Sequence, residues 1–335
     1  MQKPLVSILI PFKNTGAYLE PCLLSILNQT YSNWELLIID DGSTDNSFGI
    51  VNTFAIKDER IKLFKNTGQG IIDALKLAFE KSTGELITRM DSDDVMQPNK
   101  IEVLSNHLIL HGTKHVALGL VNYFAEGGIK DGYKSYETWL NSLTLKGRNF
   151  SEIYKECVIP SPCWMVYRSD LIACDAFNPS RYPEDYDLAF RFYKHQFKCI
   201  PCDVVLHNWR DYNNRTSRTH VHYAENHFID IKLLYFLELD YNPRKTLVVW
   251  GAGNKGKTIA KKLIAQNIPF EWICDNPKKI GRDIYGVILK PFRDLESITN
   301  PQSIITVANK TEQKTILNYM NGLNLKSISD YVFFC

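Results

Sequence analysis

Val6-Ser-Ile-Leu-Ile-Pro11 is an apolar run of strand length, and a segment with helical spacing follows it over residues 17–27. A second run covers Glu35 to Ile39 and ends in the polar turn Asp40-Asp41-Gly42-Ser43-Thr44. The order strand, helix, strand is that of a βαβ unit, whose two strands lie parallel in one sheet. This stretch therefore predicts an α/β fold.

The same alternation continues outward from this stretch, with strand patterns at 61–64 and 86–90 around a helical pattern at 71–81. The first hundred residues thus predict a mostly parallel central sheet. In such sheets ligands bind beyond the carboxyl ends of the strands, so polar residues there are candidates for a site. From 123 to 182 the periodicity weakens. We interpret this stretch as lids over the site and as elements on the side of a second, acceptor substrate.

A second βαβ pattern begins after Asn242-Pro243, with a strand pattern at 246–250 and a helix that ends near residue 266. We expect three parts along the chain: a catalytic domain (1–220), a helical linker (221–244) and a small Rossmann-like α/β domain (245–335). The last part is long enough to bury a modest core.

The turn of the second βαβ pattern contains Gly251, Gly253 and Gly256, and Asp275 ends a strand pattern about twenty residues later. This arrangement matches the dinucleotide-binding fingerprint, in which amides at a helix N-terminus face a pyrophosphate. The domain is short for two mononucleotide halves. A nucleotide or anion site at these four residues and a purely structural role both remain open.

Composition is that of an ordinary globular protein, with 44% hydrophobic and 23% charged residues and a net charge of +2 over 335 residues. Basic and acidic residues are interspersed, which argues against nucleic acid as a partner. No apolar run reaches the roughly 18 residues that span a bilayer, and no cleavage site follows the start, so we expect a cytoplasmic chain. The eight cysteines are scattered, as reduced thiols are.

The segment Arg89-Met90-Asp91-Ser92-Asp93-Asp94 stands where an apolar strand pattern ends. Three carboxylates within four residues repel one another unless a cation gathers them. Oxygen ligands of this kind suit Mg²⁺ or Mn²⁺, which keep several waters and bridge to phosphate oxygens. The segment predicts a metal site, although an acidic turn alone is a weak signal.

Four motifs together resemble the family 2 glycosyltransferases over about residues 4–220. They are Val6 to Pro11, Asp40-Asp41-Gly42-Ser43, Gly84-Glu85 and Arg89 to Asp94, in the family's order and approximate spacing. The resemblance implies the A-type glycosyltransferase fold and a nucleotide-diphospho-sugar donor, UDP-sugars being the most frequent.

The resemblance also implies roles for single residues. Pro11 would lie at the donor-facing end of the first strand, and Asp41 would bind the edge of the base. Asp93 would be the direct ligand of Mn²⁺ or Mg²⁺, and Asp91 would contact the ribose or a metal-bound water. Asp40 is better explained by turn formation.

The segment Tyr182-Pro183-Glu184-Asp185-Tyr186-Asp187 opens a helical pattern and resembles the family's Glu-Asp segment. The resemblance makes Asp185 the general base that takes the acceptor's proton in an inverting displacement. Acids in a first helical turn also complement the helix dipole, and we expect Glu184 and Asp187 to do only that.

Family members often have a histidine as a further metal contact, in a segment ending Tyr-Arg-x-His. Here Tyr212 stands where the histidine is expected, which leaves the third ligand undetermined. Arg210 or Arg215 could contact the diphosphate. Three histidines nearby in sequence are more readily structural: His207, His220 and His222.

We therefore hypothesise a metal-dependent inverting hexosyltransferase that uses a UDP-sugar and a glycan or lipid-linked acceptor in bacterial surface glycan synthesis. Peripheral membrane contact and homo-oligomers stay open. One alternative is a nucleotidyltransferase of sugar phosphates, which would need a Gly-rich basic loop after the first strand, where Pro11 to Gly16 lacks one. The other is a dinucleotide-binding sensor or oxidoreductase built on the C-terminal domain.

Overall fold

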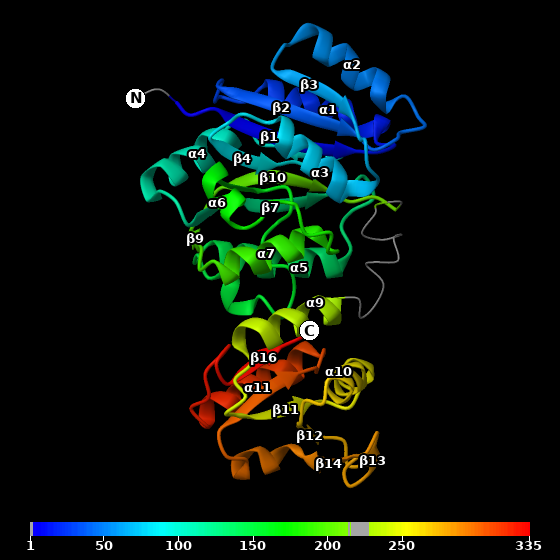
Figure 1. Cartoon of the computed structure of the whole chain (residues 1–335), viewed down its shortest axis with the longest axis vertical. Helices are drawn as coiled ribbons and strands as arrows, with labels where there is room; N and C mark the ends of the chain where they lie inside the picture. The colour runs from blue at the N-terminus through cyan, green and yellow to red at the C-terminus, as the bar shows by residue number, and fades with distance from the viewer. Residues whose placement is uncertain (1–2, 214, 216–227) are drawn as a thin grey trace. The chain divides into compact units, whose positions relative to one another are not determined.

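The computed structural model describes residues 3–213, 215 and 228–335, which are coloured in Figure 1. Within these limits the chain forms two compact units. The first comprises Met1–Phe150 and Val158–Thr219, and the second comprises Ser151–Cys157 and His220–Cys335. Each unit is built around a β-sheet of its own.

A seven-stranded sheet forms the centre of the first unit, in the order β3-β2-β1-β4-β8-β6-β9. Its strands are β1 (Val6–Phe12), β2 (Trp34–Asp40), β3 (Ile61–Lys65), β4 (Leu86–Arg89), β6 (His115–Leu118), β8 (Trp164–Tyr167) and β9 (Lys198–Ile200). β1 to β4 are parallel, whereas β8 runs antiparallel to β4 and β6. The predicted α/β fold with a mostly parallel central sheet is confirmed.

Helices follow most of these strands. They are α1 (Gly16–Leu27), α2 (Ser47–Lys57), α3 (Gly70–Lys81), α4 (Lys100–His111), α5 (Asp131–Thr144), α6 (Arg168–Ala173) and α7 (Glu184–Lys194), with a 3₁₀ turn η1 (Asn149–Glu152). β1 and β2 are buried along their whole length, as strands covered on both faces are. Because side chains alternate along a strand, Val6, Ile8 and Ile10 share one core with α1, α2 and α4. α3 packs against the other face of β1 and β2.

A second, three-stranded sheet of the first unit has the order β5-β10-β7. Its strands are β5 (Val95–Met96), β7 (Leu120–Phe124) and β10 (Val205–Arg210). β10 is parallel to β7 and antiparallel to β5. β5 begins directly after Asp94, the last residue of the acidic segment. The pairing of β5 with β10 therefore anchors the C-terminal end of that segment.

The stretch 123–182 is more regular than its sequence pattern predicts, because it contains α5, η1, β8 and α6. The helical period of α5 is hidden since one of its inward positions is a charged residue. Glu137 is buried there, and its carboxylate accepts a hydrogen bond from the backbone of Tyr123 at 2.7 Å. A hydrophobic pattern cannot register a buried position that is satisfied by hydrogen bonding.

Glu35 on β2 ties together the amino ends of three strands. Its buried carboxylate accepts hydrogen bonds from Ser7 Oγ at 2.7 Å, Lys62 Nζ at 2.7 Å and Gly84 N at 3.1 Å. Burial alone would raise the pKa of Glu35, but the hydrogen bonds from Lys62, Thr83 and Ser7 lower it to about 2. The charged form is therefore favoured in the folded chain.

We expect Glu35→Gln to lower the free energy of unfolding at neutral pH by about 1–3 kcal/mol, because the amide satisfies fewer of these donors. The folded pKa of Glu35 lies below the value of about 4.3 for an unfolded glutamate, so its contribution is complete above that pH. It is lost as the pH falls toward 2. Urea denaturation of wild type and variant should show their difference shrinking over this range. The exposed Glu80→Gln is the control, and a difference independent of pH would contradict the prediction.

The second unit contains a six-stranded sheet in the order β13-β14-β12-β11-β15-β16. Its strands are β11 (Thr246–Trp250), β12 (Glu271–Cys274), β13 (Asp283–Ile284), β14 (Val287–Pro291), β15 (Pro301–Ile305) and β16 (Tyr331–Phe333). All are parallel except β13. The parallel strands have the 3-2-1-4-5 order of a Rossmann-type sheet, which confirms a C-terminal Rossmann-like fold.

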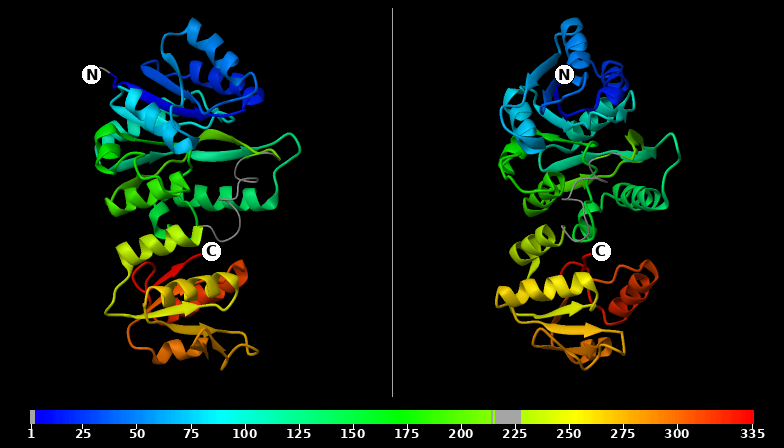
Figure 2. Two further views of the ribbon diagram at one scale, coloured as in Figure 1. Left: turned by 45° about the vertical axis from the view of Figure 1, so that its right-hand side comes forward. Right: turned by 90° about the vertical axis from the view of Figure 1, so that its right-hand side faces the viewer.

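Helices flank this sheet on both faces, as Figure 2 shows for α10 and α11. The helical elements of the unit are α9 (Phe228–Tyr235), the π-helical turn η3 (Phe236–Asp240), α10 (Asn254–Ala265), the 3₁₀ turn η4 (Phe292–Ser297) and α11 (Lys310–Gly322). Ile316 and Met320 of α11 share a core with Val248 and Ile305. The α10 connection runs from β11 to β12, and the α11 connection runs from β15 to β16, in the opposite direction along the sheet. Right-handed connections therefore place the two helices on opposite faces.

Residues 151–157 belong to the second unit, although the chain continues afterwards into β8 of the first. Tyr154 explains this placement: its ring is buried, stacks on Phe334 and meets the edge of Phe236. Its hydroxyl donates to Asp240 Oδ2 at 2.5 Å. The sequence places these seven residues in the catalytic domain, and no local pattern reveals that their partners lie so far along the chain.

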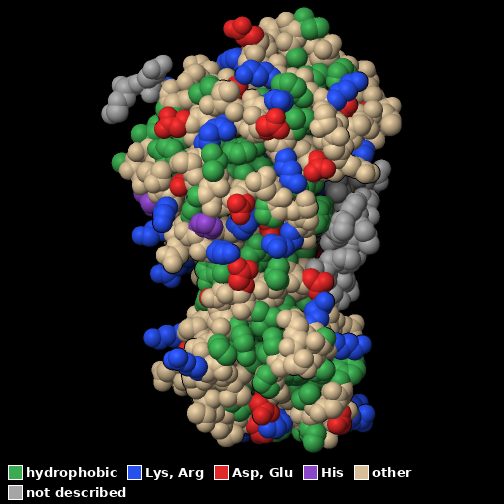
Figure 3. Space-filling view, in the orientation of Figure 1, with side chains coloured by type: hydrophobic (Ala, Val, Ile, Leu, Met, Phe, Trp, Pro, Cys, Tyr) green, Lys and Arg blue, Asp and Glu red, His purple; other side chains and the backbone are tan. Residues whose placement is uncertain are grey.

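Over the described residues, none of the helices combines the length and apolar composition that a membrane crossing requires. On the face in Figure 3, basic and acidic side chains are interspersed rather than gathered by sign. This distribution agrees with the balanced composition.

Candidate active site

The acidic segment lies at the carboxyl edge of the parallel strands β1, β2 and β4, where a doubly wound sheet binds its ligands. Pro11, near the end of β1, is buried and pairs with Ile39 of β2. Asp41 directly follows the end of β2, and Asp91 lies two positions beyond the end of β4. The structure thus brings three predicted donor residues to one edge of the sheet.

Asp41 is fixed within this edge. Its Oδ1 accepts hydrogen bonds from Asn66 Nδ2 at 2.7 Å and Gly70 N at 2.9 Å, while Lys13 Nζ lies 3.8 Å from Oδ2. The neighbouring Asp40 is buried and accepts from Ser43 N, as its interpretation as a turn residue expects. The carboxylate of Asp41 is thereby oriented by groups that sequence reasoning did not identify.

Asn14 joins the loops after β1 and β2, and the sequence analysis missed it. Its Oδ1 accepts hydrogen bonds from Thr44 N at 2.7 Å and Asp45 N at 3.3 Å, and its backbone has a positive φ of 53°. Asparagine tolerates this left-handed conformation better than most residues. The one feature of the sequence that could have identified Asn14 is its place, as a polar residue three positions after Pro11.

Asp93 is buried beneath the end of β10. Its Oδ2 accepts a hydrogen bond from the hydroxyl of Tyr212 at 2.8 Å, and its backbone carbonyl accepts from Arg210 Nε at 2.7 Å. Burial, followed by the charge of Asp94, raises the pKa of Asp93 to about 7. The side chain that replaces the expected histidine therefore contacts the predicted metal ligand directly.

Asp94 is fully buried and ends a chain of polar side chains. Its Oδ2 accepts from His207 Nε2 at 2.9 Å, and Lys100 Nζ donates to His207 Nδ1 at 3.2 Å. Its Oδ1 accepts from the backbone of Arg210 at 2.7 Å. Burial raises the pKa of Asp94 and lowers the pKa of His207, so a neutral ring passes one hydrogen bond to the carboxylate.

The histidines expected to be structural have different outcomes. His207 is fully buried, and its ring nitrogen Nε2 donates a hydrogen bond to Asp94. His220 and His222 lie outside the described residues. Lys100, at the first position of α4, was not identified from sequence, because a lysine there resembles an ordinary surface residue.

We expect Lys100→Met to lower the free energy of unfolding by about 2–4 kcal/mol, because it leaves a buried carbonyl of Pro162 and His207 Nδ1 without their donor. Guanidinium denaturation measures the loss. Lys57→Met, at the exposed end of α2, makes the same chemical change on the surface and should stay within about 0.5 kcal/mol of wild type. Equal stability of the two variants would show that the buried chain does not stabilise the unit.

Arg89 links the acidic segment to the first turn of α7. Its buried guanidinium donates to Asp91 Oδ1 at 3.1 Å and to Glu184 Oε1 at 2.9 Å. Glu184 therefore does more than complement the helix dipole, and Asp187 likewise pairs with Arg191 at 2.7 Å. The expectation of a dipole role alone was wrong for both acids. Glu184 meets Arg89 of the distant strand β4, whereas Arg191 lies one turn beyond Asp187 in α7 itself.

Asp185 lies between these two acids in the first turn of α7 and is partly exposed. Burial and the charge of Glu184 raise its pKa, and Arg89 offsets part of that effect. Among the described residues, Oε2 of Glu184 and Nε of Arg89 are buried without a hydrogen-bond partner. Unsatisfied buried polar atoms are rare, and a bound water, an ion or a catalytic role can each account for one.

Arg89 contacts Asp91 at the start of the acidic segment, whereas Arg210 and Arg215 interact with its last two acids, Asp93 and Asp94. Burial alone would lower the pKa of Arg215, but the charges of Asp94 and Asp93 raise it. The guanidinium of Arg210 lies over the rings of Phe124 at 4.5 Å and Tyr18 at 5.0 Å. Part of the cationic charge that gathers the three carboxylates is thus supplied by the protein.

A divalent cation fits the remaining acceptors of this segment. The described contacts of Asp91 and Asp93 engage one carboxylate oxygen of each. No set of three or more His, Cys, Asp or Glu side chains within the described residues is placed to hold a metal. Two carboxylates with water and a diphosphate are the usual environment of Mg²⁺ bound to a nucleotide. Burial is the main cause of the raised pKa of Asp93, and a bound cation would offset the second cause, the charge of Asp94.

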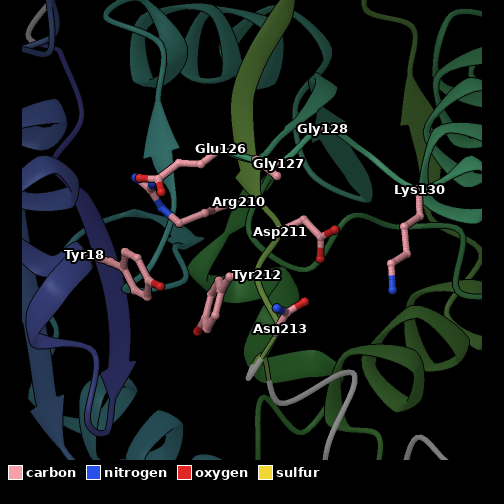
Figure 4. A pocket seen from close by; sticks show the side chains of 10 residues that line it. Tyr18, Glu126, Gly127, Gly128, Lys130, Arg210, Asp211, Tyr212 and Asn213 are labelled. Atoms are coloured by element: carbon pink, nitrogen blue, oxygen red, sulfur yellow. The ribbon is translucent and has the colours of Figure 1, made fainter.

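A pocket of about 350 Å³ adjoins the acidic segment (Figure 4). Tyr18 of α1 and Tyr212 form one side of it, with their ring centroids 4.7 Å apart. Arg210 and Glu126 also line it. Tyr212 connects the pocket to the predicted metal ligand, because it lines the pocket and its hydroxyl donates a hydrogen bond to Asp93.

Gly251 and Gly256 of the C-terminal fingerprint are required by the fold, whereas a Cβ on Gly253 would meet nothing within 4 Å. A Cβ on Gly256 would lie 2.1 Å from the carbonyl oxygen of Gly251, so α10 can approach β11 only with glycine there. Gly251 has a φ of 114°, and Gly253 is the N-cap of α10. Asp275 is exposed after β12, which is parallel and adjacent to β11. The four residues thus share one edge, and a ligand there stays a prediction.

A mostly parallel sheet with an acidic loop at its carboxyl edge and a small second sheet defines the A-type glycosyltransferase fold. The Glycosyl transferase family 2 model matches residues 7–174, half of the chain. The chain therefore belongs to glycosyltransferase family 2.

Curated relatives agree with this family, and a solved structure agrees with the fold. An "Uncharacterized glycosyltransferase" of Haemophilus influenzae is 46% identical over 119 residues, which cover 33% of this chain and 48% of the relative. WfgD of Escherichia coli, named a UDP-Glc:alpha-D-GlcNAc-diphosphoundecaprenol beta-1,3-glucosyltransferase, is 29% identical over 63% of this chain and 78% of its own. The mannosyltransferase PcManGT of Pyrobaculum calidifontis, in complex with GDP-Man and Mn²⁺, has a TM-score of 0.51 at 19% identity, covering 79% of this chain and 76% of that chain. The chain spans about half or less of the first curated relatives it matches.

Proposed function

We propose that this chain is a metal-dependent inverting hexosyltransferase that moves a sugar from a UDP-sugar to a hydroxyl of a glycan or lipid-linked acceptor. The observation that carries the proposal is the Arg89 bridge. It holds Asp91, on the donor side, next to the turn that contains Asp185. A leaving diphosphate and an acceptor hydroxyl would then lie on either side of one anomeric carbon.

The chemistry follows from these positions. The oxygen of the acceptor attacks the anomeric carbon, the bond from that carbon to the diphosphate breaks, and Asp185 accepts the acceptor's proton. A carboxylate with a raised pKa suits proton transfer near neutral pH. Asp93 and Asp91 would hold Mn²⁺ or Mg²⁺, which offsets the charge that develops on the departing diphosphate.

The names of relatives support the choice of substrates. WfgD is named for a UDP-Glc donor and a diphosphoundecaprenol-linked acceptor, and PcManGT is described with Mn²⁺. We extend UDP, Mn²⁺ and a lipid-linked acceptor to this chain as parts of the proposal. An acceptor of that kind would place the reaction in a bacterial cytoplasm at the inner face of the membrane, in surface glycan synthesis.

The alternatives have less support. A nucleotidyltransferase needs a basic Gly-rich loop after the first strand, whereas the loop after β1 is held by Asn14 against the loop after β2. A dinucleotide-dependent function would rest on the C-terminal glycines, whose packing already accounts for Gly256. A screen of UDP-sugar hydrolysis with Mn²⁺ present tests the proposal against both.

We expect Asp93→Asn to remove the Mn²⁺-dependent part of UDP binding, because the amide is a poorer ligand for a hard cation than a carboxylate. Calorimetry of UDP with and without Mn²⁺ measures it. Asp203→Asn, an exposed acid of the same unit, should bind UDP as wild type does. If Mn²⁺ strengthens UDP binding equally in both variants, Asp93 is not a metal ligand.

We expect Asp185→Asn to retain donor affinity and to lose turnover by about 10²–10⁴-fold, the usual contribution of a general base. The carboxylate is needed only when the acceptor's proton moves, so the ground-state donor contacts should persist. Transfer rates and UDP-sugar titrations separate the two effects. Asp131→Asn, which removes an exposed first-turn acid from α5, should keep both values. Wild-type transfer by Asp185→Asn would exclude it as the base.

A further inference from the structure

Apart from Arg210, which the sequence analysis offers as a diphosphate contact, the residues that line the pocket in Figure 4 are assigned to neither donor nor base. It is bounded by α1, by the ends of β7 and β10 and by the segment that leads into α5. Figure 4 shows Tyr18 and Tyr212 on one side and Lys130 on the other. At about 350 Å³ it is at the small end of ligand sites, so it suits one or a few rings rather than an extended chain.

The walls of this pocket are held in place before any ligand arrives. Arg210 is fixed by its backbone bond to Asp94 and its side-chain bond to the carbonyl of Asp93. Asp211 N donates to the carbonyl of Phe124 at 2.9 Å, which joins the ends of β10 and β7. A preformed site loses little entropy when it binds.

The lining has the chemistry of a saccharide site. Tyr18 and Tyr212 offer ring surface, and Asn213 offers an amide. The hydroxyl of Tyr18 adds a donor, while that of Tyr212 already donates to Asp93 and can only accept. Two acids, Glu126 and Asp211, balance two cations, Arg210 and Lys130, so the pocket has no excess of positive charge to attract a diphosphate. A neutral ring with many hydroxyl groups matches such a set of donors, acceptors and aromatic surface.

We propose that the Tyr18–Tyr212 pocket binds a saccharide residue of the acceptor. The inference rests on the proposed function, because it assigns the second substrate of the same reaction. Tyr212 joins the pocket to the chemistry, since its hydroxyl bonds to Asp93. A sugar ring seated on Tyr212 therefore lies one side chain from the predicted metal ligand, where an acceptor approaches a bound donor.

The test uses the full chain and a panel of p-nitrophenyl β-glucoside, β-galactoside and N-acetyl-β-glucosaminide, observed by saturation-transfer NMR. At least one glycoside should show saturable binding to wild type. Tyr18→Ala should weaken that binding by about tenfold, and Tyr18→Phe, which keeps the ring, should restore most of it. Tyr285→Ala, an exposed tyrosine of the second unit, is the matched control and should bind as wild type does.

Hydrolysis of UDP-sugars separates this proposal from the proposed function. Absence of glycoside binding in wild type, or equal binding by Tyr18→Ala, would overturn the pocket assignment even if donor is hydrolysed. Displacement of the glycoside by a UDP-sugar but not by UDP would assign the pocket to the donor's sugar and overturn the acceptor role. Glycoside binding without any donor hydrolysis would support a saccharide pocket and contradict the transferase proposal.

Discussion

Mutual repulsion of Asp91, Asp93 and Asp94 is the constraint on which the first unit depends. Three carboxylates at the end of a buried strand are costly unless cations and hydrogen bonds compensate them. Compensation comes from Arg89 beside Asp91, from Lys100 through His207 to Asp94, and from Arg215 near Asp93 and Asp94. These groups belong to different elements, so the acidic segment takes its form only when β4, α4 and β10 are assembled.

This arrangement also connects the two sides of the reaction. One buried guanidinium, that of Arg89, sets the separation between Asp91 and the first turn of α7. On the other side, the end of β10 holds Asp93 through Tyr212 and Arg210 and then continues as a wall of the saccharide pocket. Donor, base and acceptor positions would thus be fixed by the same few charged contacts.

In the second unit the glycine fingerprint can be explained by either of two physical requirements, ligand binding or helix packing. A glycine fingerprint permits close approach of a phosphate, and it also permits close packing of a helix on a strand. Gly256 is required by packing, because a side chain there would meet the carbonyl of Gly251. Lys279 donates to the carbonyl of Ala252 at 2.7 Å, so this turn also has an internal partner.

The sequence by itself determined the parallel sheet, the Rossmann-like second fold and the positions of Asp41, Asp93 and Asp185 at the ends of strands or the start of a helix. These features are encoded locally, by hydrophobic period and by the order of motifs. Only the tertiary structure decided the partners of the acids. Arg89 meets Glu184 across 95 positions, and His207 meets Asp94 across 113. Such pairs leave no local pattern, because a buried arginine or lysine has the same identity in the sequence as a solvated one and differs only in what the fold places beside it.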